Sequence, residues 1–264
     1  MKPQRSDAVF VSDVHLSAEH PATTEAFLRF IDEEVAGRAW RLYMLGDLFE
    51  YWAGDDAIAD AIDDTIDDPL AQRIVAALRA LSDSGIALAF MAGNRDFLIG
   101  DGFAKAAGLT ILDDPHRVRI AGVDLVLSHG DALCVDDVDY QRFRAMVREP
   151  AWQRAFLAKP LAERRAVIAA VRVQSEKAKR LKAAQIMDVN DAAVCALLAA
   201  HSDAIFIHGH THRPGHHQHA IGRAPRERWV LTDWDADARP PRGGAIVLRD
   251  GKLVAIDARF DEPC

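Results

Sequence analysis

The sequence contains few cysteines: three among 264 residues, at positions 134, 195 and 264. Three widely separated cysteines cannot build a disulfide framework, and their spacing does not match a cysteine-based zinc site. We therefore expect reduced thiols in a cytosolic protein. Cys134 lies close to the site predicted below, and we assign it to packing.

The chain also lacks a long apolar run. No stretch of 18 apolar residues occurs, so the sequence predicts no membrane-spanning helix. Residues 1–7 lead into a first short apolar run without the apolar region of a signal peptide. Half of the residues are hydrophobic, which is enough for a large buried core in one or two domains.

Two glycine-rich phosphate loops are missing as well. Neither a Walker motif nor a Gly-x-Gly-x-x-Gly motif occurs, so nucleotide-driven phosphoryl transfer has no support.

Polar motifs that resemble metal ligands directly follow five short apolar runs. The runs cover residues 8–11, 42–45, 86–92, 125–127 and 204–207, and their composition is typical of buried strands. Sites in α/β sheets form at the carboxyl ends of strands, so we expect one site assembled from distant segments. The motifs are Asp13-Val14-His15, Gly46-Asp47, Gly93-Asn94, Ser128-His129 and Gly209-His210-Thr211-His212.

These motifs supply more ligands than a single tetrahedral ion can use. Carboxylates, an asparagine carbonyl and neutral imidazoles suit Mn²⁺, with Zn²⁺ and Fe²⁺ as alternatives. Two ions that share a carboxylate would use the whole set, and Asp47 is the natural bridge. Such a pair activates water and stabilises displacement at phosphorus. The predicted ligands are Asp13, His15, Asp47, Asn94, His129, His210 and His212.

The rest of the chain mostly alternates strands and helices. Apolar spacing predicts helices over 21–36, 70–81, 103–107 and 190–201, and strands over 117–120, 124–127, 229–234 and 245–256. Ala121-Gly122 and Asp250-Gly251 predict hairpin turns. The aspartates of residues 55–68 indicate a solvated acidic face, and His216, His217 and His219 an exposed loop. His208 is a candidate to support the neighbouring ligands.

Between about residues 139 and 185 the strand pattern disappears. Arginine, alanine, valine and leucine recur at helical spacing, and Pro150 and Pro160 divide the segment into several helices. Residues 141–182 carry a net charge of +9, so the remainder carries −17 of the total −8. This segregation favours an anionic partner, although a solvated helical face is the alternative. Basic amphipathic helices bind anionic membrane surfaces or hold amphiphiles.

The five motifs, in this order, resemble those of the calcineurin-like metallophosphoesterases over nearly the whole chain. The resemblance implies an α/β fold, a four-layer α/β/β/α sandwich, with a dinuclear centre. It places Asp13, His15, Asp47 and His212 at one ion. It places Asp47, Asn94, His129 and His210 at the other.

One position departs from many members of that family. They carry Gly-Asn-His-Asp/Glu, whose histidine can protonate the leaving oxygen, whereas this chain has Gly93-Asn94-Arg95-Asp96. Arginine stays charged and cannot act as a general acid. A phosphate leaving group needs no proton near neutral pH, and a guanidinium can bind phosphoryl oxygens. Arg95 therefore favours a phosphoanhydride substrate, unless it only pairs with Asp96.

Short sequence segments at and beyond the motifs resemble those of the UDP-2,3-diacylglucosamine pyrophosphatases of lipid A biosynthesis. Examples are Gly46 to Glu50, His129 to Cys134 and Ile186 to Asn190. The resemblance implies hydrolysis of UDP-2,3-diacylglucosamine to UMP and 2,3-diacylglucosamine 1-phosphate at the cytoplasmic face of the inner membrane. It implies Mn²⁺ as activator, a core of residues 1–138 and 186–264, and an acyl-chain-binding helical insertion of residues 139–185. It implies Asp47, Asn94, Arg95 and His129 as catalytic residues. The implied substrate contacts are Asn94, Arg95, Asp137, Ser175, Lys179, Lys182 and His210.

Two other hypotheses stay open at this point. The chain could be another metal-dependent phosphodiesterase or a nuclease that uses the basic insertion for phosphate backbones. The few aromatic residues of the insertion give little support for base stacking, so we expect no nucleic-acid partner. Alternatively, a degraded phosphoesterase core could act as a protein scaffold, which seven intact ligands argue against. We expect a peripheral membrane protein that is a monomer.

Overall fold

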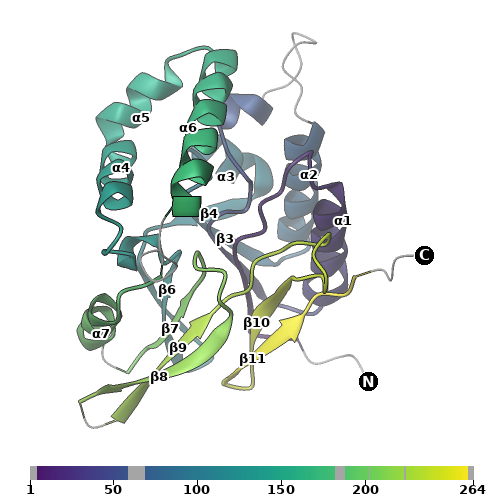
Figure 1. Cartoon of the computed structure of the whole chain (residues 1–264). Coiled ribbons are helices and arrows are strands. Elements are labelled where there is room, and N and C mark those ends of the chain that lie inside the picture. Colours follow the sequence, from purple (N-terminus) through teal and green to yellow (C-terminus); the bar gives the residue numbers. More distant parts are fainter. Residues whose placement is uncertain (1–4, 59–68, 182–187, 202, 223, 261–264) are drawn as a thin grey trace.

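The computed structural model describes residues 5–58, 69–181, 188–201, 203–222 and 224–260; for residues 174–181 and 224 it describes the backbone alone. Two β-sheets lie in the middle of the molecule, with helices on their outer faces and a group of three helices above one end of the sheets (Figure 1).

The first sheet has six strands in the order β11-β10-β1-β2-β3-β4. Strands β1 to β4 are parallel, as expected for strands joined by helices, and β10 runs antiparallel to β1. The bounds are β1 (Ala8–Val11), β2 (Arg41–Leu45), β3 (Ala87–Met91), β4 (Leu109–Leu112), β10 (Gly244–Arg249) and β11 (Lys252–Asp257).

The second sheet has five strands in the order β5-β6-β7-β9-β8. Strands β6, β7 and β9 are parallel, whereas β5 and β8 form antiparallel edges. The bounds are β5 (His116–Ile120), β6 (Val123–Ser128), β7 (Ile205–His208), β8 (Gly215–Ile221) and β9 (Ala224–Val230).

Seven α-helices occur in the described residues. Helix α1 ends where a π-helical turn, Ile31–Val35, begins, and α3 ends at Gly108, which has a left-handed conformation. The bounds are α1 (Pro21–Phe30), α2 (Pro69–Asp83), α3 (Asp101–Ala107), α4 (Val138–Arg148), α5 (Pro150–Leu157), α6 (Leu161–Leu181) and α7 (Asp191–Ala200).

Three hydrophobic clusters fill the spaces between successive layers of the fold. Alternate residues of β1, such as Val9 and Phe10, point to opposite faces of the first sheet. Val9 packs with α1 and α2, whereas Phe10 packs between the two sheets with Leu127 and Ile207. A third core joins β6 and β7 to α7 on the outer face of the second sheet. The predicted four-layer α/β/β/α sandwich is therefore confirmed.

Helices α4, α5 and α6 fall in the segment predicted to be an insertion, and Figure 1 shows them above the carboxyl ends of the strands. Arg164 of α6 is 1% exposed and forms a bidentate pair with Asp56, which ties this helix to the loop after β2. The division into a core and an insertion between residues 139 and 185 stays a prediction.

Several sequence-based expectations were wrong in detail. The predicted strand over 229–234 overlaps only the end of β9, because β9 begins at Ala224. The exposed loop predicted at His216 to His219 is the edge strand β8. Asp55 is not merely solvated: its carboxylate accepts the backbone N–H groups of Gly100 and Phe103 at the start of α3. Cys134 is buried in the core against α7, as assigned.

Among the helices in the described part of the chain, none combines the length and apolar character needed to cross a membrane.

Candidate metal centre

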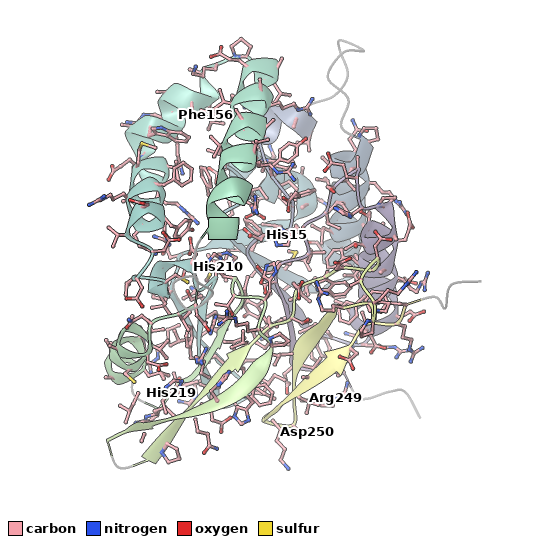
Figure 2. All side chains as sticks on the ribbon, in the orientation of Figure 1. His15, Phe156, His210, His219, Arg249 and Asp250 are labelled. Carbon is pink, nitrogen blue, oxygen red and sulfur yellow. The ribbon has the colours of Figure 1, made fainter. Side chains whose placement is uncertain are left out.

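The predicted ligands meet because backbone pairing continues past the ends of the strands. Beyond β1 and β2, the N–H of His15 donates to Asp47 O at 3.0 Å and that of Leu16 donates to Leu48 O at 2.9 Å. Beyond β6 and β7, the N–H of Gly209 donates to His129 O at 3.0 Å. The loops of the two sheets also contact each other, since His129 Nδ1 lies 2.9 Å from Leu45 O. Figure 2 shows His15 and His210 in the middle of the molecule, near one end of α6.

Five of the seven predicted ligands have left-handed backbone conformations. Their φ angles lie between 53° and 66°, a region that residues other than glycine seldom adopt. Such conformations cost about 1–3 kcal/mol each and cluster at functional sites, where the surrounding structure imposes them. The five are Asp13, His15, Asp47, His210 and His212.

Glycines in the motifs allow two loops to approach closely. A Cβ atom on Gly93 would collide with the Asp47 carboxylate, and one on Gly46 would lie 2.5 Å from His129 Nδ1. Any side chain at either position would displace a predicted ligand.

The first ligand group contains Asp13, His15 and His212. The Nε2 atoms of His15 and His212 are 3.3 Å apart, and His212 Nε2 lies 3.4 Å from Asp13 Oδ1. Two ligand atoms that each bind one ion at about 2.1 Å are separated by about 3–3.5 Å. The separations in this group therefore fit a shared metal ion.

The second group contains Asp13, Asp47 and His129. Asp47 faces both groups, because Oδ1 lies 3.7 Å from His129 Nε2 and Oδ2 lies 3.9 Å from His15 Nε2. This arrangement suits a bridging carboxylate, as predicted. Asn94 joins the second group through its Oδ1 atom, 3.0 Å from His129 Nε2.

His210 lies beside the second group without belonging to it. Its ring is 5.0 Å from the ring of His129, and its backbone N–H donates to Asp13 Oδ2 at 2.8 Å. The structure thus places all seven predicted ligands around one point, with His210 at the periphery. Their roles as ligands stay predictions.

A buried carboxylate oxygen provides a further test of the fit to a metal. Asp13 is fully buried, and its Oδ1 accepts no hydrogen bond among the described residues, although His212 Nε2 lies 3.4 Å away. Burying a carboxylate oxygen without a partner is costly unless a cation is bound there. The donor set of carboxylates, one amide oxygen and imidazoles suits divalent cations, so the residues fit the metals that the fold implies.

In three of the four predicted histidine ligands, the second ring nitrogen lies close to an oxygen atom, a common feature of metal-binding histidines. His129 Nδ1 lies 2.9 Å from Leu45 O, and His15 Nδ1 lies 2.8 Å from Glu50 Oε2. His212 Nδ1 lies 3.5 Å from Asp233 Oδ2. These contacts leave the Nε2 atoms facing the ligand groups. Glu50 and Asp233 could not be predicted from the sequence, since neither stands in a recognisable spacing to its histidine.

Three of the predicted ligands have strongly perturbed pKa values. Burial opposes the ionisation of Asp13, yet its contact with His212 and the nearby imidazolium charges lower its pKa. Burial disfavours the charged form of His129, but the carboxylates of Asp47, Asp131 and Asp13 raise its pKa to about 9. Burial and the charge of His129 lower the pKa of His210 to about 4. A metal ion must therefore displace a proton from His129.

Asp96 stabilises the loop that carries Asp47. Its buried carboxylate accepts the N–H groups of Leu48 at 2.7 Å and Gly93 at 2.9 Å, and that of Asp47 at 3.2 Å. Burial and the neighbouring Asp47 carboxylate raise the pKa of Asp96 to about 7. The Asp96 carboxylate is thus bound by backbone N–H groups. This argues against the alternative that Arg95 is present only to form an ion pair with Asp96.

Arg95 is held beside the ligands by its backbone. Its N–H donates to Asp47 Oδ1 at 2.8 Å, and its carbonyl accepts the N–H of Trp52 at 3.2 Å. The guanidinium lies 3.6 Å from Glu50 Oε1, and 14% of the side chain is exposed. A fixed cation next to the candidate metal centre can bind an anionic group placed there.

Helix α4 contacts the ligand loops directly. Tyr140 Oη donates to Asp131 Oδ2 at 2.6 Å, and Arg144 Nε donates to the same oxygen at 2.8 Å. Arg148 donates to the carbonyl of Gly93 at 2.8 Å, and the Tyr140 ring stacks on His210. Nothing in the sequence pattern predicted that basic residues of this helix would anchor it to the core.

The structure describes only part of the remaining predicted substrate contacts. Asp137 is the N-cap of α4 and accepts the backbone N–H of Tyr140 at 3.2 Å. Ser175 and Lys179 lie on α6, but their side chains are outside the described residues. Lys182 lies outside the described residues altogether.

Comparisons with known proteins agree with this site. Residues 8–214 match the family described as calcineurin-like phosphoesterase. The chain is 51% identical to a UDP-2,3-diacylglucosamine hydrolase of Aromatoleum aromaticum, covering 92% of this chain and 97% of the relative. It is 43% identical to the protein of that name from Escherichia coli, covering 87% of this chain and 91% of the relative.

A solved structure supports the fold alone. A dimetal phosphatase from Danio rerio superposes with a TM-score of 0.50 at 14% identity, covering 97% of this chain and 96% of that chain. Calcineurin-like phosphoesterases use divalent metals, and the ligand groups described above could bind them. The chain therefore belongs to the calcineurin-like phosphoesterase family, within which it closely resembles the UDP-2,3-diacylglucosamine hydrolases.

Proposed function

We propose that this protein hydrolyses the diphosphate bond of UDP-2,3-diacylglucosamine and releases UMP and 2,3-diacylglucosamine 1-phosphate. The observation that carries the proposal is an intact ligand cluster in a chain that matches UDP-2,3-diacylglucosamine hydrolases over almost its whole length. The reaction is a step of lipid A biosynthesis.

We assign the seven predicted ligands to two cation positions, as the family resemblance implies. Asp13, His15, Asp47 and His212 would hold one ion, and Asp47, Asn94, His129 and His210 would hold the other. When bound, two such ions, which we propose to be Mn²⁺, supply Lewis acidity and activate water for attack at phosphorus. Glu50, Asp233 and the carbonyl of Leu45 fix the orientation of the histidine rings.

Arg95 supports a diphosphate rather than an alkyl ester as the substrate. Its guanidinium binds a phosphoryl oxygen and stabilises the negative charge that develops during bond cleavage. The departing sugar phosphate needs no proton near neutral pH, because the second pKa of a phosphate is about 6. The absence of a histidine at position 95 is therefore compatible with turnover.

The rest of the substrate lies between the ligand loops and helices α4 to α6. We assign Asn94, Arg95 and His210 to the phosphates, and Asp137, Ser175, Lys179 and Lys182 to further polar contacts. Exposed apolar side chains on α5 and α6 are suited to the acyl chains: Leu157, Val167, Val171 and Val173 are 38–55% exposed. The aromatic rings of α5 are less suited to nucleic-acid bases, because Trp152 and Phe156 already stack on each other.

We further propose that the protein acts as a monomer at the cytoplasmic face of the inner membrane without crossing it. The basic and apolar residues of α4 to α6 support contact with an anionic lipid surface.

A substrate panel tests the proposed function. Purified protein with Mn²⁺ is incubated with UDP-2,3-diacylglucosamine, UDP-N-acetylglucosamine or single-stranded DNA, and products are identified by mass spectrometry. We expect UMP only from the acylated sugar nucleotide. DNA cleavage in place of UMP release would support a nuclease, and inactivity on all three substrates would support a scaffold.

A further inference from the structure

One carboxylate, Glu50, contacts three functional parts of the molecule at once. Its Oε2 atom lies 2.8 Å from Nδ1 of His15, a predicted metal ligand. Its Oε1 atom accepts a hydrogen bond from Arg172 of helix α6 at 2.8 Å and lies 3.6 Å from the guanidinium of Arg95. No spacing in the sequence indicated this arrangement.

The backbone holds Glu50 firmly in this place. The segment after β2 runs alongside the segment after β1, and the N–H of Glu50 donates to Leu16 O at 3.1 Å. The adjacent bridge between Leu16 and Phe49 is parallel. The backbone pairing of these two segments therefore places both Asp47 and Glu50 near His15.

The two oxygens of Glu50 have different partners and so can perform different tasks. A carboxylate at Nδ1 fixes the ring of His15 with Nε2 facing His212 and Asp47. The other oxygen lies between two cations from different elements, Arg95 in the loop after β3 and Arg172 on α6. The guanidinium of Arg172 also lies over the Tyr51 ring. Only 16% of the Glu50 side chain is exposed, so these pairs are partly shielded from water.

We propose that Glu50 is a positioning residue that couples helix α6 to the catalytic centre, with Arg172 acting through it. Glu50 orients His15 for the metal and holds Arg95 within reach of the substrate phosphate. Arg172 fixes the Glu50 carboxylate, so the position of α6 affects both. The proposal rests on the proposed function for the role of Arg95, whereas the effect on the metal is independent of it.

The test is a double-mutant cycle with Glu50→Gln and Arg172→Gln. The control cycle uses Glu25→Gln and Arg73→Gln, which break an exposed pair of the same residue types between α1 and α2. Mn²⁺ binding to metal-stripped protein is measured by titration calorimetry, and kcat and KM are measured with UDP-2,3-diacylglucosamine.

We expect Glu50→Gln to weaken Mn²⁺ binding by about 10–100-fold, the usual effect of losing the partner of a ligating histidine. In the wild-type protein, Arg172→Gln should lower kcat/KM by at least about tenfold. In the Glu50→Gln variant, the factor by which Arg172→Gln lowers kcat/KM should be smaller by at least about threefold. The control pair should leave both quantities unchanged.

Two results would overturn the proposal. Mn²⁺ binding by Glu50→Gln at wild-type strength would remove the positioning role at His15. Additive effects of the two substitutions on kcat/KM would mean that Arg172 acts on the substrate directly and not through Glu50. Failure of the proposed function is distinguishable, because the wild-type protein would then bind Mn²⁺ but release no UMP.

Discussion

Replacing Arg95 by histidine changes the side chain that most distinguishes this site from many other phosphoesterases. The backbone of residue 95 makes the contacts to Asp47 and Trp52, and these do not depend on the side chain. We therefore expect Arg95→His to keep its metal site, with Mn²⁺ affinity within about threefold of wild type, or about 0.7 kcal/mol.

Turnover should fall much further. The guanidinium is fixed next to Glu50 and offers several N–H donors to phosphoryl oxygens. A histidine is shorter and mostly neutral at pH 7.5, so it replaces neither the reach nor the charge. Removing one group that stabilises developing charge typically lowers kcat by about 10²–10³-fold, or about 2.7–4 kcal/mol.

The assay is UMP release under saturating Mn²⁺ and substrate, so that weaker binding cannot account for the loss. Arg119→His on strand β5, where the arginine is 68% exposed and pairs with Asp124, is the matched control and should retain full activity. If Arg95→His turned over at the wild-type rate, the site would not need a fixed cation there, and the argument for an anhydride substrate would be refuted.

Three further predictions concern the packing and the metal site. Gly93→Ala should weaken Mn²⁺ binding by more than about tenfold, because the new methyl group collides with the Asp47 carboxylate. The control is Gly215→Ala, whose Cβ would lie 3.1 Å from His217 Nε2 and which should not change Mn²⁺ binding. Equal Mn²⁺ affinities of the two variants in calorimetry would contradict this prediction. Asp131→Asn leaves Arg144 without its buried partner, so at pH 7 it should lower the free energy of unfolding by about 3 kcal/mol and Tm by about 6–12 °C. The control, Asp139→Asn, breaks an exposed pair with Arg142 and should change Tm by about 1 °C or less. The folded-state pKa of Asp131 is lowered, so its stabilisation is complete above its unfolded pKa of about 3.8 and is lost as pH falls further; a Tm difference that stayed constant into strong acid would argue against the ion pair. Mn²⁺ affinity of metal-stripped protein should rise with pH up to about 9, because the ion must displace the proton of His129, and affinity independent of pH between 6 and 9 would contradict that.

The sequence predicted those features that depend on local pattern. Short apolar runs such as Leu42–Leu45 mark buried strands, and each was followed by the residues that the structure brings together. Hairpins at Ala121-Gly122 and Asp250-Gly251 formed as expected, because their turn residues adopt positive φ angles. Strand β8 was missed because its histidines and glutamine lack a buried alternating face.

Long-range partners could not be predicted in the same way. Glu50 and Asp233 are isolated acids in the sequence, and only the packing of separate loops brings them to His15 and His212. The anchoring of α4 through Arg144 and Arg148 likewise depends on the approach of two distant elements. The sequence shows that this segment is basic, but it does not show that some of its arginines hold α4 against the core.

Hydrolysis by two bound metal ions can be tested by titrating the metal-stripped protein with Mn²⁺ while UMP release from UDP-2,3-diacylglucosamine is followed. We expect no UMP release without metal, and a rate of release that rises until two equivalents of Mn²⁺ are bound and then levels off. Undiminished release in the presence of a chelator, or no release from the protein with two ions bound, would contradict it.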